Sequence, residues 1–110
     1  MSVSWLGYDF DVYDPLTTTW NDVGGVYIFA GTNHQNEWAP LYIGQADSFH
    51  NRIPCHERWA EAALLGATHV HAMTVPQAAN RARIEHELCL AYQPPLNTQL
   101  RSLAGFRRGA

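Results

Sequence analysis

Two tripeptides, Gly25-Val26-Tyr27 and Tyr42-Ile43-Gly44, constrain the fold of this chain more than any other feature. Each lies in a short run of apolar, β-branched and aromatic residues, Val26 to Ala30 and Leu41 to Ile43, which is typical of a buried strand. The polar residues 31–40 between the two runs predict a hairpin loop, so the strands should be antiparallel neighbours. Because side chains alternate along a strand, both tyrosines can lie on one face of the sheet.

A helix is predicted after the second strand, because apolar residues recur at helical spacing from Phe49 to Leu65. Pro54 interrupts this pattern, and proline is tolerated only in the first turn of a helix. Either the helix begins near Asn51, or a kink lies between Arg52 and His56.

Residues His69 to Val75 alternate and are rich in β-branched side chains, which predicts a third strand. Pro76 is suited to the first position of a second long helix, which should reach about Tyr92, before Pro94-Pro95. The chain is therefore predicted to be α/β, with a small, mainly antiparallel three-stranded sheet flanked by helices in the order strand, strand, helix, strand, helix.

Four polar residues follow the tripeptides at definite intervals: Arg52, His56, Glu85 and Asn97. With the stretch Gly44 to Ile53 and the segments Ile84 to Leu88 and Gln93 to Asn97, they make the chain resemble the GIY-YIG nuclease family from Gly25 to Asn97. The resemblance implies a metal-dependent endonuclease that hydrolyses DNA phosphodiester bonds. It also implies the α/β architecture described above.

By this resemblance Glu85 would hold one divalent ion, Mg²⁺ or Mn²⁺, because Mg²⁺ keeps most of its waters and needs few protein ligands. Spacing alone favours another interpretation, an ion pair with Arg81 four residues earlier on the helix. Arg52 would bind the scissile phosphate, since a guanidinium can donate two parallel hydrogen bonds. Its alternative is a solvated helix arginine.

The resemblance makes Tyr27 the candidate general base, with Tyr42, His56 and Asn97 supporting the site. A tyrosine has an ordinary pKa of about 10, so metal or arginine would have to lower it. Each residue has a structural alternative: buried tyrosines that need only a hydrogen-bond partner, a packed histidine, and an asparagine in the turn after two prolines. Asn97 would otherwise orient Glu85 or the substrate.

The charge of the chain argues mildly against a nucleic-acid partner, because its formal net charge is -3. The distribution is uneven, since residues 1–47 hold six acidic side chains and no basic one, whereas residues 48–110 hold all seven arginines. Two other interpretations stay open. One is a catalytically inactive nucleic-acid or protein-binding module of the same fold, and the other is an acidic regulatory protein in which residues 1–22 cover the arginine-bearing face.

A chain of 110 residues suffices for one domain. The predicted organisation is an N-terminal extension at 1–22 packed on the domain, a GIY-YIG-like nuclease domain at 23–98 and an arginine-bearing tail at 99–110. The sequence shows no membrane-spanning run and no signal peptide, which predicts a cytoplasmic protein. With no room for an added DNA-binding domain, either recognition is by DNA shape, or a partner protein or a second copy would supply specificity. His69 and His71 could reach one face of their strand, but no third metal ligand accompanies them, so the pair is expected at an edge or on a solvated face.

Overall fold

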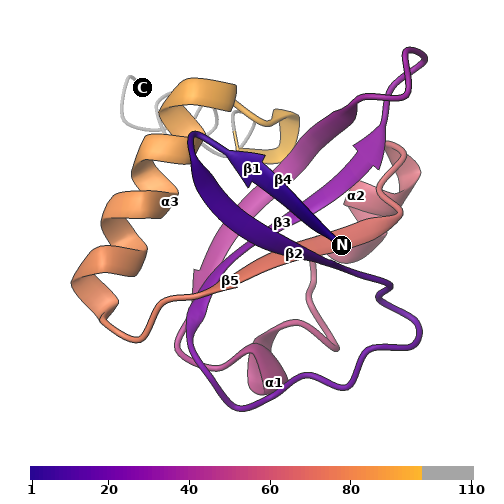
Figure 1. Cartoon of the computed structure of the whole chain (residues 1–110). Coiled ribbons are helices and arrows are strands. Elements are labelled where there is room, and N and C mark those ends of the chain that lie inside the picture. The colour runs from indigo at the N-terminus through magenta and orange to yellow at the C-terminus, as the bar shows by residue number, and fades with distance from the viewer. Residues whose placement is uncertain (98–110) are drawn as a thin grey trace, which may run out of the picture.

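The computed structural model describes residues 1–97, so the predicted tail at 99–110 lies outside the described residues. Five strands and three helices follow one another along the chain (Figure 1). They are β1 (Ser2–Trp5), β2 (Tyr8–Tyr13), β3 (Gly25–Thr32), β4 (Trp38–Ala46), α1 (Phe49–Arg52), α2 (Trp59–Leu64), β5 (His69–Thr74) and α3 (Ala78–Tyr92).

The sheet has five strands in the order β1-β2-β5-β3-β4, and every neighbouring pair is antiparallel. The predicted three-stranded sheet, and the predicted order of elements, are therefore wrong. The N-terminal segment adds two strands, and β2 pairs with β5 through Val12 and His71. Phe10 is fully buried while Asp9 and Asp11 on either side are exposed, which is the alternation of a half-buried strand. This alternation is present in the sequence, but the acidic residues on either side of Phe10 obscured it.

The hairpin of β3 and β4 confirms the predicted strand pair. Tyr27 lies opposite Gly44, and Phe29 lies opposite Tyr42, so both tyrosines leave the same face of the sheet. Gly44 is required there, because a Cβ atom at this position would lie 2.5 Å from the Tyr27 hydroxyl oxygen. Gly25 is required because a Cβ atom would collide with the carbonyl oxygen of Met73 on β5. The glycines of both tripeptides thus make room for close packing.

The helix predicted over residues 49–65 is divided into α1 and α2, and Pro54 lies in the break between them. This is the second of the two alternatives that the proline allowed. Ser48 caps α1 by accepting a hydrogen bond from the backbone N–H of Asn51 at 3.2 Å. Helix α3 begins at Ala78, two residues after Pro76, and ends at Tyr92. The next residue, Gln93, caps the helix with a left-handed φ of 44°.

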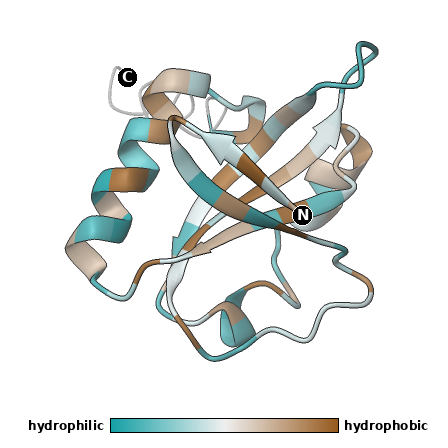
Figure 2. Ribbon diagram, viewed as in Figure 1, coloured by the Kyte–Doolittle hydropathy of each residue, from teal (hydrophilic) through white to brown (hydrophobic). Residues whose placement is uncertain are grey.

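Apolar side chains form a core on each face of the sheet. On one face Tyr27, Phe29 and Val70 pack against residues of α1 and α2, and on the other face Val26 and Ile28 pack against α3 through Ile84 and Leu88. In Figure 2 hydrophobic residues recur along the central strands, whereas the tip of the β3–β4 hairpin is hydrophilic. Within residues 1–97 none of the helices has the length and apolar character needed to cross a bilayer.

Candidate active site

Three predicted site residues meet on the α1–α2 face of the sheet. The hydroxyl oxygen of Tyr27 lies 2.7 Å from Nε2 of His56, which belongs to the segment between α1 and α2. The Tyr42 ring is 6.4 Å from that of Tyr27 and 5.2 Å from that of His56, between centroids. The break at Pro54 turns the chain so that His56 is buried against the two strands, which a continuous helix would not do.

The hydrogen bonds of His56 define its protonation. Burial, together with the Arg52 charge, lowers the pKa of His56 to about 4, so the ring is neutral at pH 7. Its Nδ1 accepts a hydrogen bond from the backbone N–H of Arg58 at 3.0 Å, which leaves the ring proton on Nε2. His56 therefore donates to the hydroxyl oxygen of Tyr27, and the phenolic proton of Tyr27 is free to point elsewhere.

Arg52, the predicted phosphate ligand, forms a bidentate pair with Glu57. Its two terminal nitrogens lie 2.7 Å and 2.8 Å from the two carboxylate oxygens. The hydrogen bonds to Glu57 raise the pKa of Arg52, and those to Arg52 lower the pKa of Glu57. The sequence analysis missed Glu57, because a separation of five residues across a break is not a helical pairing interval.

Glu85 approaches this group from α3. It is half-buried, and burial raises the pKa of its carboxyl group above the ordinary value. Its charge also raises the pKa of Tyr27 and of Tyr42, so the carboxylate lies within electrostatic reach of the two phenols. The ion pairs formed within residues 1–97 do not include Glu85.

The alternative ion pair between Glu85 and Arg81 is not formed. Arg81 is buried, and its guanidinium donates instead to the carbonyl oxygens of Val75 and Pro76, at 3.1 Å and 2.8 Å. Arg81 thus stabilises the backbone that connects β5 to α3. Glu85 is left facing the site.

Asn97 is bound to the backbone of β4. Its Oδ1 accepts from the N–H of Ile43, and its Nδ2 donates to the carbonyl oxygen of Ile43, both at 2.8 Å. Ile43 lies between Tyr42 and Gly44, in the strand at the edge of the sheet. Asn97 therefore satisfies backbone groups beside the site, an arrangement that differs from the expected contact with Glu85 or substrate.

The two tyrosines are weak acids in this setting. Burial is the main cause that raises the pKa of Tyr27 and that of Tyr42, and the Arg52 charge opposes it only in part. Both side chains are therefore phenols at pH 7. Proton transfer through either oxygen would require added positive charge near it.

The two histidines of the third predicted strand differ in burial, since His69 is half-buried and His71 lies in the core. His71 is fully buried, and its Nδ1 accepts a hydrogen bond from Nε1 of Trp5 at 3.0 Å. The expectation that this pair lies on a solvated face is wrong for His71, because β1 and Trp38 cover it. Within residues 1–97 no three side chains of the metal-binding types lie together.

Comparisons with known proteins bear on the fold of the chain. By sequence, the chain matches no family model and no curated protein. Among solved structures, it is similar to the GIY-YIG N-terminal endonuclease domain of UvrC from Thermotoga maritima with its catalytic divalent cation, magnesium, at 25% identity and a TM-score of 0.56. The match covers 69% of this chain and 84% of that one. The chain has the GIY-YIG nuclease fold.

Two variants of the same GIY-YIG domain give the same result. One carries alanine in place of an asparagine and matches at 25% identity with a TM-score of 0.56. The other carries phenylalanine in place of a tyrosine and matches at 26% identity with a TM-score of 0.55. Each match covers 69% of this chain and 83% of the other, and both variants are bound to the catalytic cation.

Proposed function

We propose that this chain is a metal-dependent endonuclease that hydrolyses DNA phosphodiester bonds. The observation that carries the proposal is the convergence of Tyr27, Tyr42 and His56, with the charges of Arg52 and Glu85 near enough to shift the pKa values of both phenols. Phosphodiester hydrolysis needs positive charge at the phosphate oxygens, an activated water and help for the departing alkoxide. Arginine, carboxylate-held metal and phenol–imidazole groups can supply these.

The residues present fit a single divalent ion at Glu85. The carboxylate is half-buried, its pKa is raised by burial, and it takes part in none of the ion pairs within residues 1–97. A cation would therefore compensate the buried charge. Mg²⁺ needs few protein ligands, so one carboxylate with waters is a sufficient donor set. When bound, the ion would neutralise phosphate charge and lower the pKa of a water.

Arg52 would donate both of its terminal N–H groups to the scissile phosphate. Its present partner, Glu57, is a planar carboxylate held by two hydrogen bonds, so it occupies the same donors that two phosphate oxygens would use. Phosphate and Glu57 would compete for the guanidinium. A strong divalent-metal site beside Arg52 would favour the phosphate.

Tyr27 would accept the proton of the attacking water, and His56 would assist it. The phenolic proton would pass to a solvent water first. The N–H of His56 donates to the Tyr27 oxygen, so the imidazole would stabilise the phenolate that then accepts the proton of the attacking water. Tyr42 would help to position the phosphate from the same face. Asn97 would hold the β4 backbone that carries Tyr42.

The test is cleavage of a supercoiled plasmid and a panel of branched DNAs with Mg²⁺ or Mn²⁺. Wild type would nick or cut a member of the panel, and Glu85→Gln would lose at least a hundredfold in rate while keeping its circular dichroism spectrum. Glu87→Gln is the matched control, because Glu87 lies on α3 and binds Tyr8 and Arg83. Undiminished cleavage by Glu85→Gln, or none by folded wild type, would reject the proposal.

The second candidate function is a binding module of the same fold without catalysis. The Arg52–Glu57 pair favours it, since the guanidinium is already engaged. Binding of DNA without metal-dependent cleavage on any member of the panel would support this alternative. In either function, we propose that a partner protein or a second copy contributes specificity, because residues 1–97 form a single sheet with its helices.

A further inference from the structure

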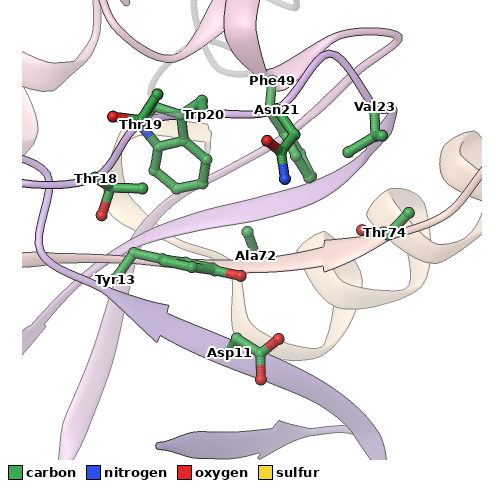
Figure 3. Close-up of a pocket in the computed structure, with 10 residues that line it drawn as sticks. All are labelled: Asp11, Tyr13, Thr18, Thr19, Trp20, Asn21, Val23, Phe49, Ala72 and Thr74. Atoms are coloured by element: carbon green, nitrogen blue, oxygen red, sulfur yellow. The ribbon is translucent and has the colours of Figure 1, made fainter.

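Two cavities open on the α1–α2 side of the sheet, and they differ in chemistry. The first, shown in Figure 3, has a volume of about 90 Å³ and is lined by polar groups that include Asp11, Thr19 and Asn21. For comparison, an apolar cavity of about 150 Å³ can hold a benzene ring. The first cavity is too small for such a ring, and the Asp11 carboxylate would repel a phosphate.

The second cavity is larger, and the side chains that line it are of apolar types, with backbone groups between them. Its volume is about 160 Å³, and its walls include Leu16, Trp20, Phe29, Ile53, Pro54 and Trp59. Leu16 and Pro54 are exposed, so the cavity opens to solvent at their side. Trp20 and Phe29 are buried and form its inner wall. A flat aromatic ring would therefore fit in size and find aromatic surfaces to contact.

This cavity borders the proposed site through neighbouring residues. Ile53 and Pro54, which form one wall, lie between Arg52 and His56 in the chain. The Phe29 ring contacts His56 at 4.9 Å and Trp59 at 5.1 Å, between centroids, so one side chain borders both places. A phosphate bound at Arg52 would thus bring the adjoining nucleotides to the mouth of the cavity.

We propose that this cavity binds an unstacked nucleobase of the DNA strand whose phosphate lies at Arg52. The inference rests on the proposed function and narrows its substrate class. A base inside a duplex must leave its stack and its partner to enter such a pocket, which costs least when it is already unpaired. The favoured substrates are therefore single strands, bulges and other DNA with an unpaired nucleotide. Because the walls are apolar, the pocket recognises a ring rather than a particular base.

Binding measurements on the full chain test this directly. The probes are a single-stranded oligonucleotide carrying 2-aminopurine, the same strand in a perfect duplex, and the duplex with 2-aminopurine as a single bulged nucleotide. Glu85→Gln is used throughout, so that the DNA stays intact. We expect the single strand and the bulge to bind roughly tenfold more tightly than the duplex, with quenching of 2-aminopurine fluorescence by the tryptophans. Equal affinity for all three DNAs would overturn the inference.

A matched pair of surface variants locates the effect. Leu16 and Leu64 are 90% and 88% exposed, and only Leu16 lines the cavity. Leu16→Glu places a negative charge at the opening and should weaken binding of the bulged DNA about tenfold, whereas Leu64→Glu should change it less than twofold. Equal weakening by both variants would show that charge alone matters, and would overturn the inference.

Cleavage by the protein with Glu85 intact separates this inference from the proposed function. Cutting that is equal on paired and unpaired DNA, and unaffected by Leu16→Glu, would leave the nuclease standing and remove the base pocket. Tighter binding of unpaired DNA, with fluorescence quenching but without cleavage of any DNA, would reject the nuclease and retain the base pocket. The pocket would then stand as the binding site of an inactive module.

Discussion

The guanidinium of Arg52 donates its two terminal hydrogen bonds to Glu57, so a DNA phosphate has to compete with a carboxylate of the same chain. Glu57 is exposed, which allows the pair to open without unfolding the segment between α1 and α2. In the proposed function, the Glu57 side chain would therefore lower the affinity of Arg52 for phosphate.

Glu57→Gln should tighten DNA binding and lower KM by roughly two- to fivefold, the range expected for loss of an exposed ion pair. The amide keeps the shape of the side chain but removes its charge and one of its two acceptors. Fluorescence anisotropy and initial cleavage rates measure the change. Glu61→Gln breaks the comparable pair between Arg58 and Glu61 and is the control. Weaker binding by Glu57→Gln would contradict the competition.

At the residue scale, the family resemblance predicted that several side chains come together. Tyr27, Tyr42 and His56 are in mutual contact, and Glu85 lies within electrostatic reach of both phenols. Spacing could not predict that Glu57 pairs with Arg52, or which ring nitrogen of His56 carries the proton. Both depend on how the chain turns after Arg52, and that turn places Glu57 on Arg52 and the Arg58 N–H on the imidazole.

At the scale of elements, the edge strand β4 depends on a side chain that follows α3 in the chain. Asn97 makes two hydrogen bonds with the backbone of Ile43 and so supplies the partners that a sixth strand would offer. The amide is suited to this task because it both donates and accepts. This explains physically why an asparagine stands there.

Asn97→Asp should lower the free energy of unfolding by about 1–3 kcal/mol, because the second carboxylate oxygen would face the carbonyl oxygen of Ile43 without a proton between them. Urea denaturation at pH 7 measures the change. Asn80→Asp makes the same substitution at an exposed position of α3 and should be nearly neutral. Equal stabilities of the two variants would refute the structural role assigned to Asn97.

The two N-terminal strands are the elements of the sheet that the sequence did not predict. Trp5 and Phe10 are buried in the core on the α3 face, and β1 and β2 extend the sheet beyond β5, at the edge away from β4. These strands do not lie over the site as an acidic cover would. Removing residues 1–22 would expose the β5 edge, so loss of folding, rather than release of the site, is the expected result.

At the scale of the whole molecule, two buried histidines couple folding to pH. Burial lowers the pKa of His56 to about 4 and that of His71 to about 4, and the two lie on opposite faces of the sheet. An unfolded histidine binds its proton near pH 6.5. Between these values the unfolded chain takes up protons that the folded chain does not, so unfolding becomes more favourable as the pH falls.

The free energy of unfolding should therefore drop between about pH 6.5 and pH 4, by up to the order of 3 kcal/mol for each histidine. The raised pKa of Glu85 acts in the opposite direction. Urea denaturation at a series of pH values measures the slope. His56→Gln should flatten it, while His34→Gln, in the exposed hairpin, should leave it unchanged. A flat profile for wild type would refute the coupling.

Local sequence by itself predicted the β3–β4 hairpin, a third strand from His69 to Val75 and a second long helix reaching about Tyr92. These features follow from alternation, helical spacing and proline position, which act within a few residues. The grouping of polar residues into one site came from the resemblance to a known family. Tertiary structure alone decided the two added strands, the Arg52–Glu57 pair, the Asn97–Ile43 bonds and the proton position on His56. Each of these joins groups whose approach depends on packing between separate segments, and burial then sets their pKa values.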